Sequence, residues 1–324
     1  MKYRPKRSFA AIFGIALACS AQAPSAAQLP PTPLAPRPSA GAEEIVVTAR
    51  RSGIPVWHVV GPTTTIVLVG SVKSVAAGTH WDPASLEGAL VKADQIMFPE
   101  SAAVSLGLFS GVGALRKFLA QRSLPKRQTL QTMMTAEQFA RLVALRNKGV
   151  LKAGFERTHP LHLAHSLGSA TAGKGGLGPG TYVRRIARKN RLKMVPMAQL
   201  GAKAVMADLF GSTPKTHVPC LMDAVALAEA GSGAIKARSD AWAERRVPAA
   251  LASVAWRMER SCWPAGSGWD TARANRLSGT VRGLLAQPKV TLAVISLDSL
   301  AQRGGVLDDL VAAGFDVRGP KWKP

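Results

Sequence analysis

The chain has 324 residues, of which 47% are hydrophobic and only 6% aromatic, so it can hold one large or two modest domains with a real core. No internal period is visible, which excludes solenoids and other repeat architectures. Lysine and arginine outnumber aspartate and glutamate by 42 to 19, and a formal net charge of +23 favours an anionic partner or surface.

The first 27 residues have the pattern of a secretory signal peptide. Four basic residues precede an apolar run over 9–18, and small residues follow, with a preferred cleavage site after Ala27 and another after Ala23. The run is too short to cross a bilayer, and no later stretch is long enough to do so. We therefore expect a periplasmic or secreted protein of a Gram-negative envelope. Cys19 lies in a poor lipobox, IALAC, so we do not expect a lipoprotein.

Residues 28–53 read as a proline-rich linker that ends in a short segment of β-forming residues. That segment, Glu43–Arg51 (EEIVVTARR), is similar to the TonB box of TonB-dependent receptors, which binds its partner by adding a strand to a sheet. A contact with TonB is thus one expectation. An edge strand or a disordered leader are the alternatives.

From residue 54 onward, short apolar runs alternate with helical patterns. The runs 54–60 and 65–72 flank a Gly-Pro turn and predict a β-hairpin. Asp82-Pro83 predicts the start of a helix, and Thr135 with Gln138 predicts a capping box. Further helices are predicted over 102–121, 181–190, 199–210, 220–230, 235–260 (interrupted at Pro248), 270–286 and 304–314, and further strands over 95–98, 193–197, 289–297 and 315–317.

This order of elements predicts an α/β protein. The N- and C-terminal strands would form one central mixed sheet in a domain over residues 54–324, with a large helical insertion at about 101–288.

Positive charge is concentrated in the middle of the chain. Between residues 101 and 207 there are 18 lysines and arginines against two acids, Glu137 and Glu156. In an exported protein we expect anionic lipid, lipopolysaccharide or polysaccharide as the partner rather than nucleic acid. A solvated charged face is the alternative. The proposed anion-binding residues are Arg184, Arg185, Arg188, Lys189, Arg191 and Lys193.

Two cysteines remain after signal-peptide removal, Cys220 and Cys262. Because the compartment is expected to be oxidising and the count is even, a disulfide between them is predicted. Two buried free thiols are the alternative.

Three stretches of the chain resemble the TraB/PrgY/GumN family, which includes the Tiki proteases. PVWHVVGPTTTIVLVGSVKS is similar to the family's opening hairpin, which ends in Gly-x-x-His. DPASLEGALVKADQIMFPES is similar to the next helix and a strand that ends in glutamate, and VTLAVISLDSLAQRGGVLDDLVAAGFDV is similar to the closing strand and helix with a second Gly-x-x-His. The resemblance implies a metal-dependent peptidase built on two histidines and one glutamate.

The sequence departs from this pattern at the residues that would bind the metal. Lys73 stands at the first histidine position after Gly70, and Ser296 and Ser299 replace the glycine and histidine of the second motif. An ammonium repels a dication and serine is a weak ligand, so only Glu100 remains. Lys73 and Glu100 are expected to face each other as an ion pair in place of the metal.

Two other segments are candidate binding sites. His159, His162 and His165 are spaced three residues apart, which would place neighbours on one helical face as a weak metal-site candidate. The glycine-rich stretch 173–180 is either a phosphate loop or a mobile loop.

We therefore expect a non-catalytic binding or accessory protein, a pseudoenzyme without a cofactor. A metal-dependent hydrolase with a rearranged site and a TonB-interacting protein are the alternatives.

Overall fold

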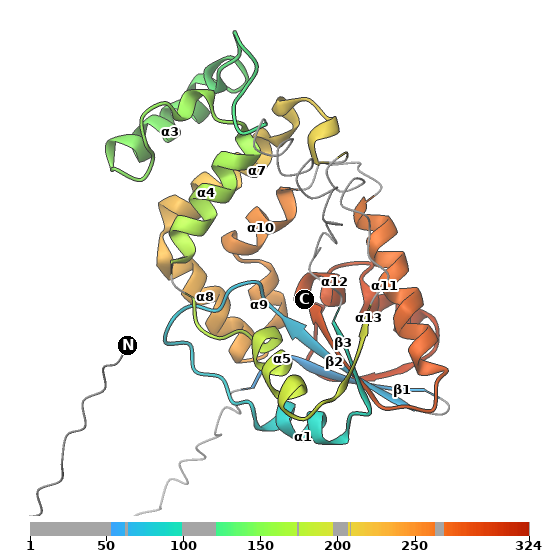
Figure 1. The fold of residues 1–324 in the computed structure, drawn as a ribbon. Coiled ribbons are helices and arrows are strands. Elements are labelled where there is room, and N and C mark those ends of the chain that lie inside the picture. Colours follow the sequence, from blue (N-terminus) through green and yellow to red (C-terminus); the bar gives the residue numbers. More distant parts are fainter. Residues whose placement is uncertain are drawn as a thin grey trace, which may run out of the picture. The chain divides into compact units, whose positions relative to one another are not determined.

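The computed structural model describes residues 53–61, 64–98, 121–173, 175–196, 207, 209–262 and 269–323. Several predictions lie outside these residues: the signal peptide, the TonB-box-like segment Glu43–Arg51, the helix over 102–121, most of the helix over 199–210, and Glu100. Labels of helices and strands follow Figure 1.

Among the described residues, six strands form one mixed sheet in the order β4-β3-β5-β2-β1-β6. β4, β3, β5 and β2 run parallel, and β1 is antiparallel to both of its neighbours. The two ends of the chain therefore meet in the sheet, as predicted, because β2 pairs with β5 and β1 with β6 (Figure 1). The strands are β1 (Val56–Val60), β2 (Thr65–Ser71), β3 (Gln95–Phe98), β4 (Lys193–Pro196), β5 (Thr291–Ser296) and β6 (Asp316–Arg318).

Helices make up most of the other described residues, which confirms the α/β class. They are α1 (Ala84–Lys92), α3 (Ala136–Asn147), α4 (Pro160–Ala172), α5 (Pro179–Lys189), α7 (Val218–Ala230), α8 (Ser232–Ala243), α9 (Val247–Leu251), α10 (Val254–Ser261), α11 (Trp269–Leu285), α12 (Leu297–Ala301) and α13 (Val306–Ala312).

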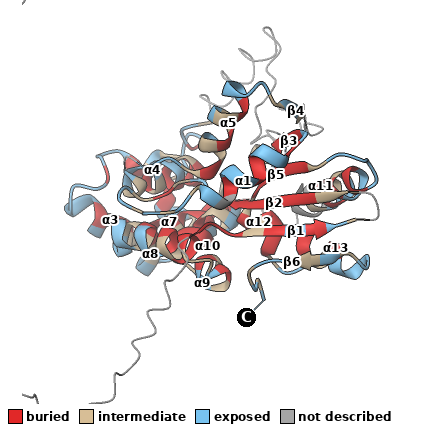
Figure 2. Ribbon diagram, turned by 90° about the horizontal axis from the view of Figure 1, so that it is seen from below, coloured by how far each residue is buried: buried red, intermediate tan, exposed pale blue. Residues whose placement is uncertain are grey.

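Local sequence signals explain many of these elements. The apolar run of β2 is buried at five consecutive positions, which is typical of a central strand covered on both faces (Figure 2). Thr135 accepts a hydrogen bond from the backbone N–H of Gln138, and the Gln138 side chain bonds back, so the predicted capping box is confirmed. At the start of α1, Asp82 accepts a hydrogen bond from the backbone N–H of Ala84.

Three details add to the sequence predictions. The break predicted at Pro248 is confirmed, but the segment 235–260 breaks a second time at the N-cap Ser253, so it belongs to three helices, α8, α9 and α10. A short helix, α12, follows β5 directly, because Ser296 caps it. The predicted strand at 193–197 forms as β4 and pairs with β3, so the chain returns to the sheet midway through the predicted helical insertion.

The described residues form two hydrophobic cores. The first surrounds the sheet and includes buried residues of all the central strands and of α1, α5, α11, α12 and α13. The second is built from α3, α4, α7 and α10, and α4 and α7 lie side by side in it (Figure 1). α8 contributes to both cores, with Ile235 in the helical core and Trp242 in the sheet core.

A disulfide joins Cys220 in α7 to Cys262 at the end of α10, as predicted. Both residues are buried in the helical core. The bond closes a loop of 42 residues, for which loop-closure entropy gives a stabilisation of about 4 kcal/mol.

Within the described part of the chain, no single helix combines the length and apolar character needed to cross a bilayer. One bent pair, Pro214–Ala230 with Ser232–Ala243 at 94°, satisfies both criteria only when its two helices are taken together.

Arg238 of α8 is the one fully buried ion-pair cation among the described residues. Its side chain is 0% exposed, and its guanidinium donates to the Glu259 carboxylate at 2.8 Å and to the Ser74 carbonyl at 2.7 Å. Ser74 belongs to the loop after β2 and Glu259 to α10, so this one side chain joins the sheet to the helical core.

Replacing Arg238 with methionine should lower the free energy of unfolding by about 3 kcal/mol, because the variant leaves Glu259 and the Ser74 carbonyl unpaired. Urea denaturation measures this loss. Arg257→Met is the matched control: Arg257 is exposed on the same helix as Glu259, and its loss should change the stability by less than about 0.5 kcal/mol. Equal effects of the two changes would contradict the role given to Arg238.

Candidate functional site at the carboxyl ends of the parallel strands

The parallel pairing of β2 and β5 brings the two degenerate motifs together. Gly70 pairs with Ile295 and Ser71 with Ser296, so both strands end at the same level of the sheet. The first motif continues to Lys73 and the second to Ser299. β3 ends at Phe98 within the described residues, and Glu100 lies outside them, so its pairing with Lys73 stays a prediction.

Gly70 is needed for packing at this edge. A Cβ at this position would lie 2.8 Å from Leu297 Cδ1 and 3.0 Å from Trp57 Cζ3, both closer than ordinary contact. The Gly70 carbonyl accepts a hydrogen bond from Trp242 Nε1 at 2.8 Å. The glycine at the strand end thus lets α12 and two tryptophans approach the backbone.

The two serines of the second motif are occupied with each other. Ser296 is the N-cap of α12 and accepts a hydrogen bond from the Ser299 backbone N–H, and its hydroxyl also donates to Ser299 Oγ at 2.7 Å. Ser299 is 5% exposed. This arrangement is a helix cap, and neither hydroxyl is presented as a strong metal ligand.

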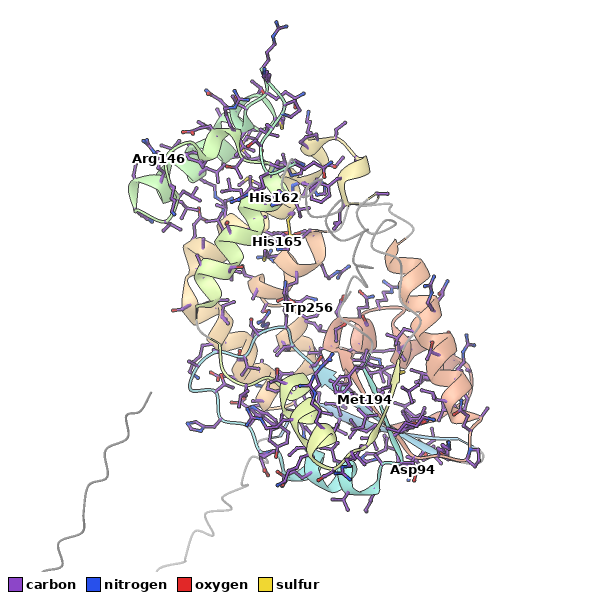
Figure 3. All side chains as sticks on the ribbon, viewed as in Figure 1. Asp94, Arg146, His162, His165, Met194 and Trp256 are labelled. Carbon is purple, nitrogen blue, oxygen red and sulfur yellow. A yellow bond between two sulfur atoms is a disulfide. The ribbon has the colours of Figure 1, made fainter. Side chains whose placement is uncertain are left out.

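Lys73 is exposed, and its charge acts on a histidine of α4. The residue His165 reaches solvent, but protein atoms partly surround its ring. That desolvation, followed by the positive charge of Lys73 and the neighbouring His162, lowers the pKa of His165. His162 and His165 lie on successive turns of α4 (Figure 3). The fold therefore brings the HPLHLAH segment near the first motif, although the two are far apart in sequence.

The remaining histidines of this region form an aromatic cluster in the helical core. The rings of His159 and His217 are 5.3 Å apart, and the His159 ring also packs near Phe210 and His162. His159 Nδ1 accepts from the Leu161 backbone N–H, and His217 Nε2 donates to the Leu209 carbonyl. Desolvation, then the charges of His217 and His162, lowers the pKa of His159 to about 4, and desolvation also lowers that of His217. His159 is therefore neutral at pH 7.

The described side chains do not fit a metal ion. Among them, no group of three or more His, Cys, Asp or Glu residues is arranged to hold one, and this includes His159, His162 and His165. Lys73 and Ser299 offer an ammonium and a capped hydroxyl where the family resemblance implies imidazoles. We derive no catalytic step through a metal.

The loop after β2 is held on two sides. The Ala76 backbone N–H donates to Ser239 Oγ of α8 at 3.0 Å, next to the Arg238 contact with Ser74. On the other side, the Gly176 backbone N–H donates to the Val75 carbonyl at 2.7 Å. A Cβ at Gly175 would lie 3.1 Å from that carbonyl, so these glycines serve a close backbone contact.

The basic segment forms an amphipathic helix, α5, with Val183 and Ala187 buried against the sheet core. Arg184 is half-buried, with its guanidinium 4.3 Å from the centre of the Phe98 ring. The other five predicted cations are exposed on α5 and the following edge strand β4. We call them the α5 surface: Arg185, Arg188, Lys189, Arg191 and Lys193.

Sequence analysis missed several residues that shape this site. Arg238, Ser239 and Trp242 of α8 hold the loop after β2, and His217 and Phe210 complete the histidine cluster. The only signal in the sequence was an arginine, Arg238, and a tryptophan, Trp242, within a helical pattern. The fold is needed to show what these two side chains contact.

Gly70→Ala should destabilise the protein by about 1–3 kcal/mol, because the added methyl group overpacks Leu297 and Trp57. Gly88→Ala is the matched control. Gly88 is exposed in α1 with open space around it, so alanine there should raise stability by roughly 0.5–1 kcal/mol through helix propensity. Chemical denaturation of both variants gives the two signs, and a neutral Gly70→Ala would contradict the packing argument.

Acid should destabilise the helical core through His159. Its pKa is about 4 in the folded chain and about 6.5 when unfolded, so the unfolded state binds the proton first. This stability is fully present above pH 6.5 and is lost as the pH falls toward 4, by roughly 3 kcal/mol for this residue. Unfolding at a series of pH values should show a shallower slope in His159→Asn, which retains an N-cap acceptor. His80→Asn, at an exposed position, should leave the slope unchanged. Equal slopes in all three proteins would contradict this account.

Comparison with known proteins supports one relationship. The family model of the TraB/PrgY/gumN family matches residues 55–319, from the start of the hairpin to the end of β6. Searches of curated proteins and of solved structures gave no match. The match covers most of the chain and includes both motif positions at the sheet edge, and the chain therefore belongs to the TraB/PrgY/gumN family.

Proposed function

We propose that this protein is an exported binding or accessory protein of the cell envelope that does not carry out metal-dependent hydrolysis. The observation that supports this most directly is the state of the second motif. Ser296 and Ser299 bond to each other as a helix cap, and Lys73 stands at the first motif. Neither arrangement offers the neutral nitrogen ligands that a catalytic zinc site requires.

The α5 surface supports an anionic partner. Its five cations are exposed, while the opposite side of the helix packs on the sheet core. The Arg184 guanidinium over Phe98 fixes the start of this surface. Such a one-sided array attracts anionic lipid, lipopolysaccharide or acidic polysaccharide through charge rather than through a shaped cavity.

A rearranged hydrolase is the second candidate, and one observation favours it. Lys73 lies close enough to His165 for its charge to lower the pKa of that histidine, so an ammonium and an imidazole share one region. Metal analysis of the purified protein and a peptide hydrolysis assay separate the candidates. Stoichiometric metal, or hydrolysis abolished by Glu100→Gln, would replace the first proposal with the second.

Charge reversal on α5 tests the proposed partner. The triple variant Arg185→Glu, Arg188→Glu, Lys189→Glu should lose sedimentation with vesicles that contain phosphatidylglycerol, and retention on immobilised lipopolysaccharide. Wild-type binding should also weaken steeply with salt, because charges are screened beyond about 8 Å at physiological ionic strength.

The control variant for this experiment changes the net charge by the same amount, but at residues outside the α5 surface. Lys126→Glu, Arg146→Glu, Lys152→Glu alters three exposed cations outside α5 and β4, of which Arg146 is on α3 (Figure 3). It should bind as the wild type does. If the α5 variant keeps full binding, or if both triples lose it equally, the α5 surface is not the contact.

A further inference from the structure

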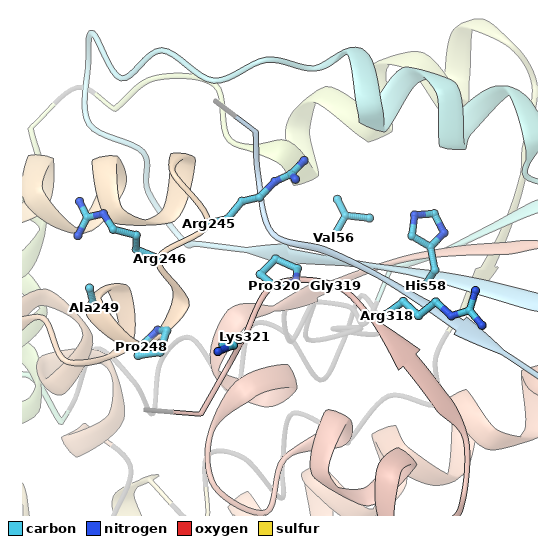
Figure 4. Close-up of a pocket in the computed structure, with 10 residues that line it drawn as sticks. All are labelled: Val56, His58, Arg245, Arg246, Pro248, Ala249, Arg318, Gly319, Pro320 and Lys321. Carbon is cyan, nitrogen blue, oxygen red and sulfur yellow. The ribbon is translucent and has the colours of Figure 1, made fainter. Parts of the chain in front are cut away.

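A second basic site lies at the other edge of the sheet, away from β4. It is a surface pocket of about 790 Å³ between three segments: the turn from α8 to α9, the strand β1, and the chain that leaves β6 (Figure 4). Its lining residues are Val56, His58, Arg245, Arg246, Pro248, Ala249, Arg318, Gly319, Pro320 and Lys321.

The lining carries four formal positive charges and no acid. Two of them are paired with acids just outside the lining: Arg246 with Glu244 at 2.7 Å, and Arg318 with Asp316 at 2.5 Å. Arg245 and Lys321 have no ion-pair partner among the described residues. Arg245 Nε is moreover a buried donor that no described acceptor reaches. The lining thus carries a local surplus of two positive charges.

Arg245 is positioned by the C-terminus of α8. Its φ is +60°, the left-handed conformation in which many helices end, and the backbone N–H groups of Arg245 and Arg246 donate to the carbonyls of Trp242 and Ala241. The Arg245 guanidinium packs against Gly53. A Cβ at Gly53 would lie only 2.8 Å from Arg245 Nη2, so the glycine leaves room for the guanidinium.

The opposite wall of the pocket is firmly anchored. The Pro320 carbonyl accepts a hydrogen bond from Trp57 Nε1 at 2.9 Å, and Trp322 Nε1 donates to the Asp308 carboxylate at 2.9 Å. Lys321 lies between these two anchors and is exposed. The pocket therefore has a cationic group on each of two fixed walls.

We propose that this pocket binds a phosphomonoester of sugar or nucleotide size. A phosphate monoester carries a charge of about −1.5 to −2 at neutral pH, which matches the surplus of Arg245 and Lys321. The arginine fork can hold two phosphate oxygens and the lysine supplies a point charge. The volume suits a small organic ligand, and Val56, Pro248 and Pro320 give apolar contact for its body. This site is independent of the α5 surface and of the proposed function.

Isothermal titration calorimetry of the full chain with ribose 5-phosphate tests the proposal, and vesicles that contain phosphatidic acid test a lipid source of the same group. Saturable binding of one equivalent of the sugar phosphate supports a soluble ligand. The phosphatidic acid vesicles are tested with the α5 triple variant, so that the α5 surface does not contribute, and binding to these vesicles alone supports the lipid headgroup. In either case, Arg245→Gln and Lys321→Gln should each weaken binding about tenfold, as expected for loss of a charged hydrogen bond.

Arg146→Gln removes the same charge from α3 and should leave the affinity unchanged, as should the α5 triple variant for ribose 5-phosphate. Lys321→Gln keeps the test decisive if Arg245→Gln folds poorly, because Lys321 is exposed and makes no ion pair among the described residues. The proposal is overturned if neither probe binds, or if Lys321→Gln and Arg146→Gln have equal effects.

Discussion

The buried guanidinium of Arg238 is the constraint on which the arrangement of this protein depends. It cannot be removed from water without partners, so Ser74 and Glu259 must stay within hydrogen-bond distance. α8 spans both hydrophobic cores, and Arg238 lies between its helical-core and sheet-core residues. The loop after β2 is thereby fixed against the helical region. This fixed loop carries Lys73 and explains why its charge reaches His165 of α4.

The same edge of the sheet is shaped by packing and by helix capping. Gly70 is required by the close approach of Leu297 and Trp57, whatever residue stands three positions later. Ser296 is required as the cap of α12. Packing and capping thus hold the carboxyl ends of β2 and β5 in register.

Sequence patterns predicted the hairpin, the mixed sheet, the capping box and the disulfide, because each rests on local periodicity or on the pairing of the two remaining cysteines, Cys220 and Cys262. The contacts that define the site could not be predicted in this way. Arg238 and Ser74 are 164 residues apart, and the basic pocket joins β1, α9 and the chain after β6. Such contacts depend on how the two hydrophobic cores pack against each other. Hydrophobic patterning shows which residues are buried, but it does not show which distant residues meet.

The sheet region and the helical core differ in where they place groups that can carry positive charge. Arginines and lysines of α5 and of the β6-edge pocket stay at the surface, where water and anions can compensate them. The histidines of the helical core avoid charge instead, because burial and their mutual repulsion keep His159 neutral well below pH 6.5. Acidification would add charge to a chain that already carries a large positive excess. The helical core, held by one disulfide and one buried arginine, is therefore where we expect low pH to destabilise the protein, and the two basic edges of the sheet are the surfaces that we propose bind anions.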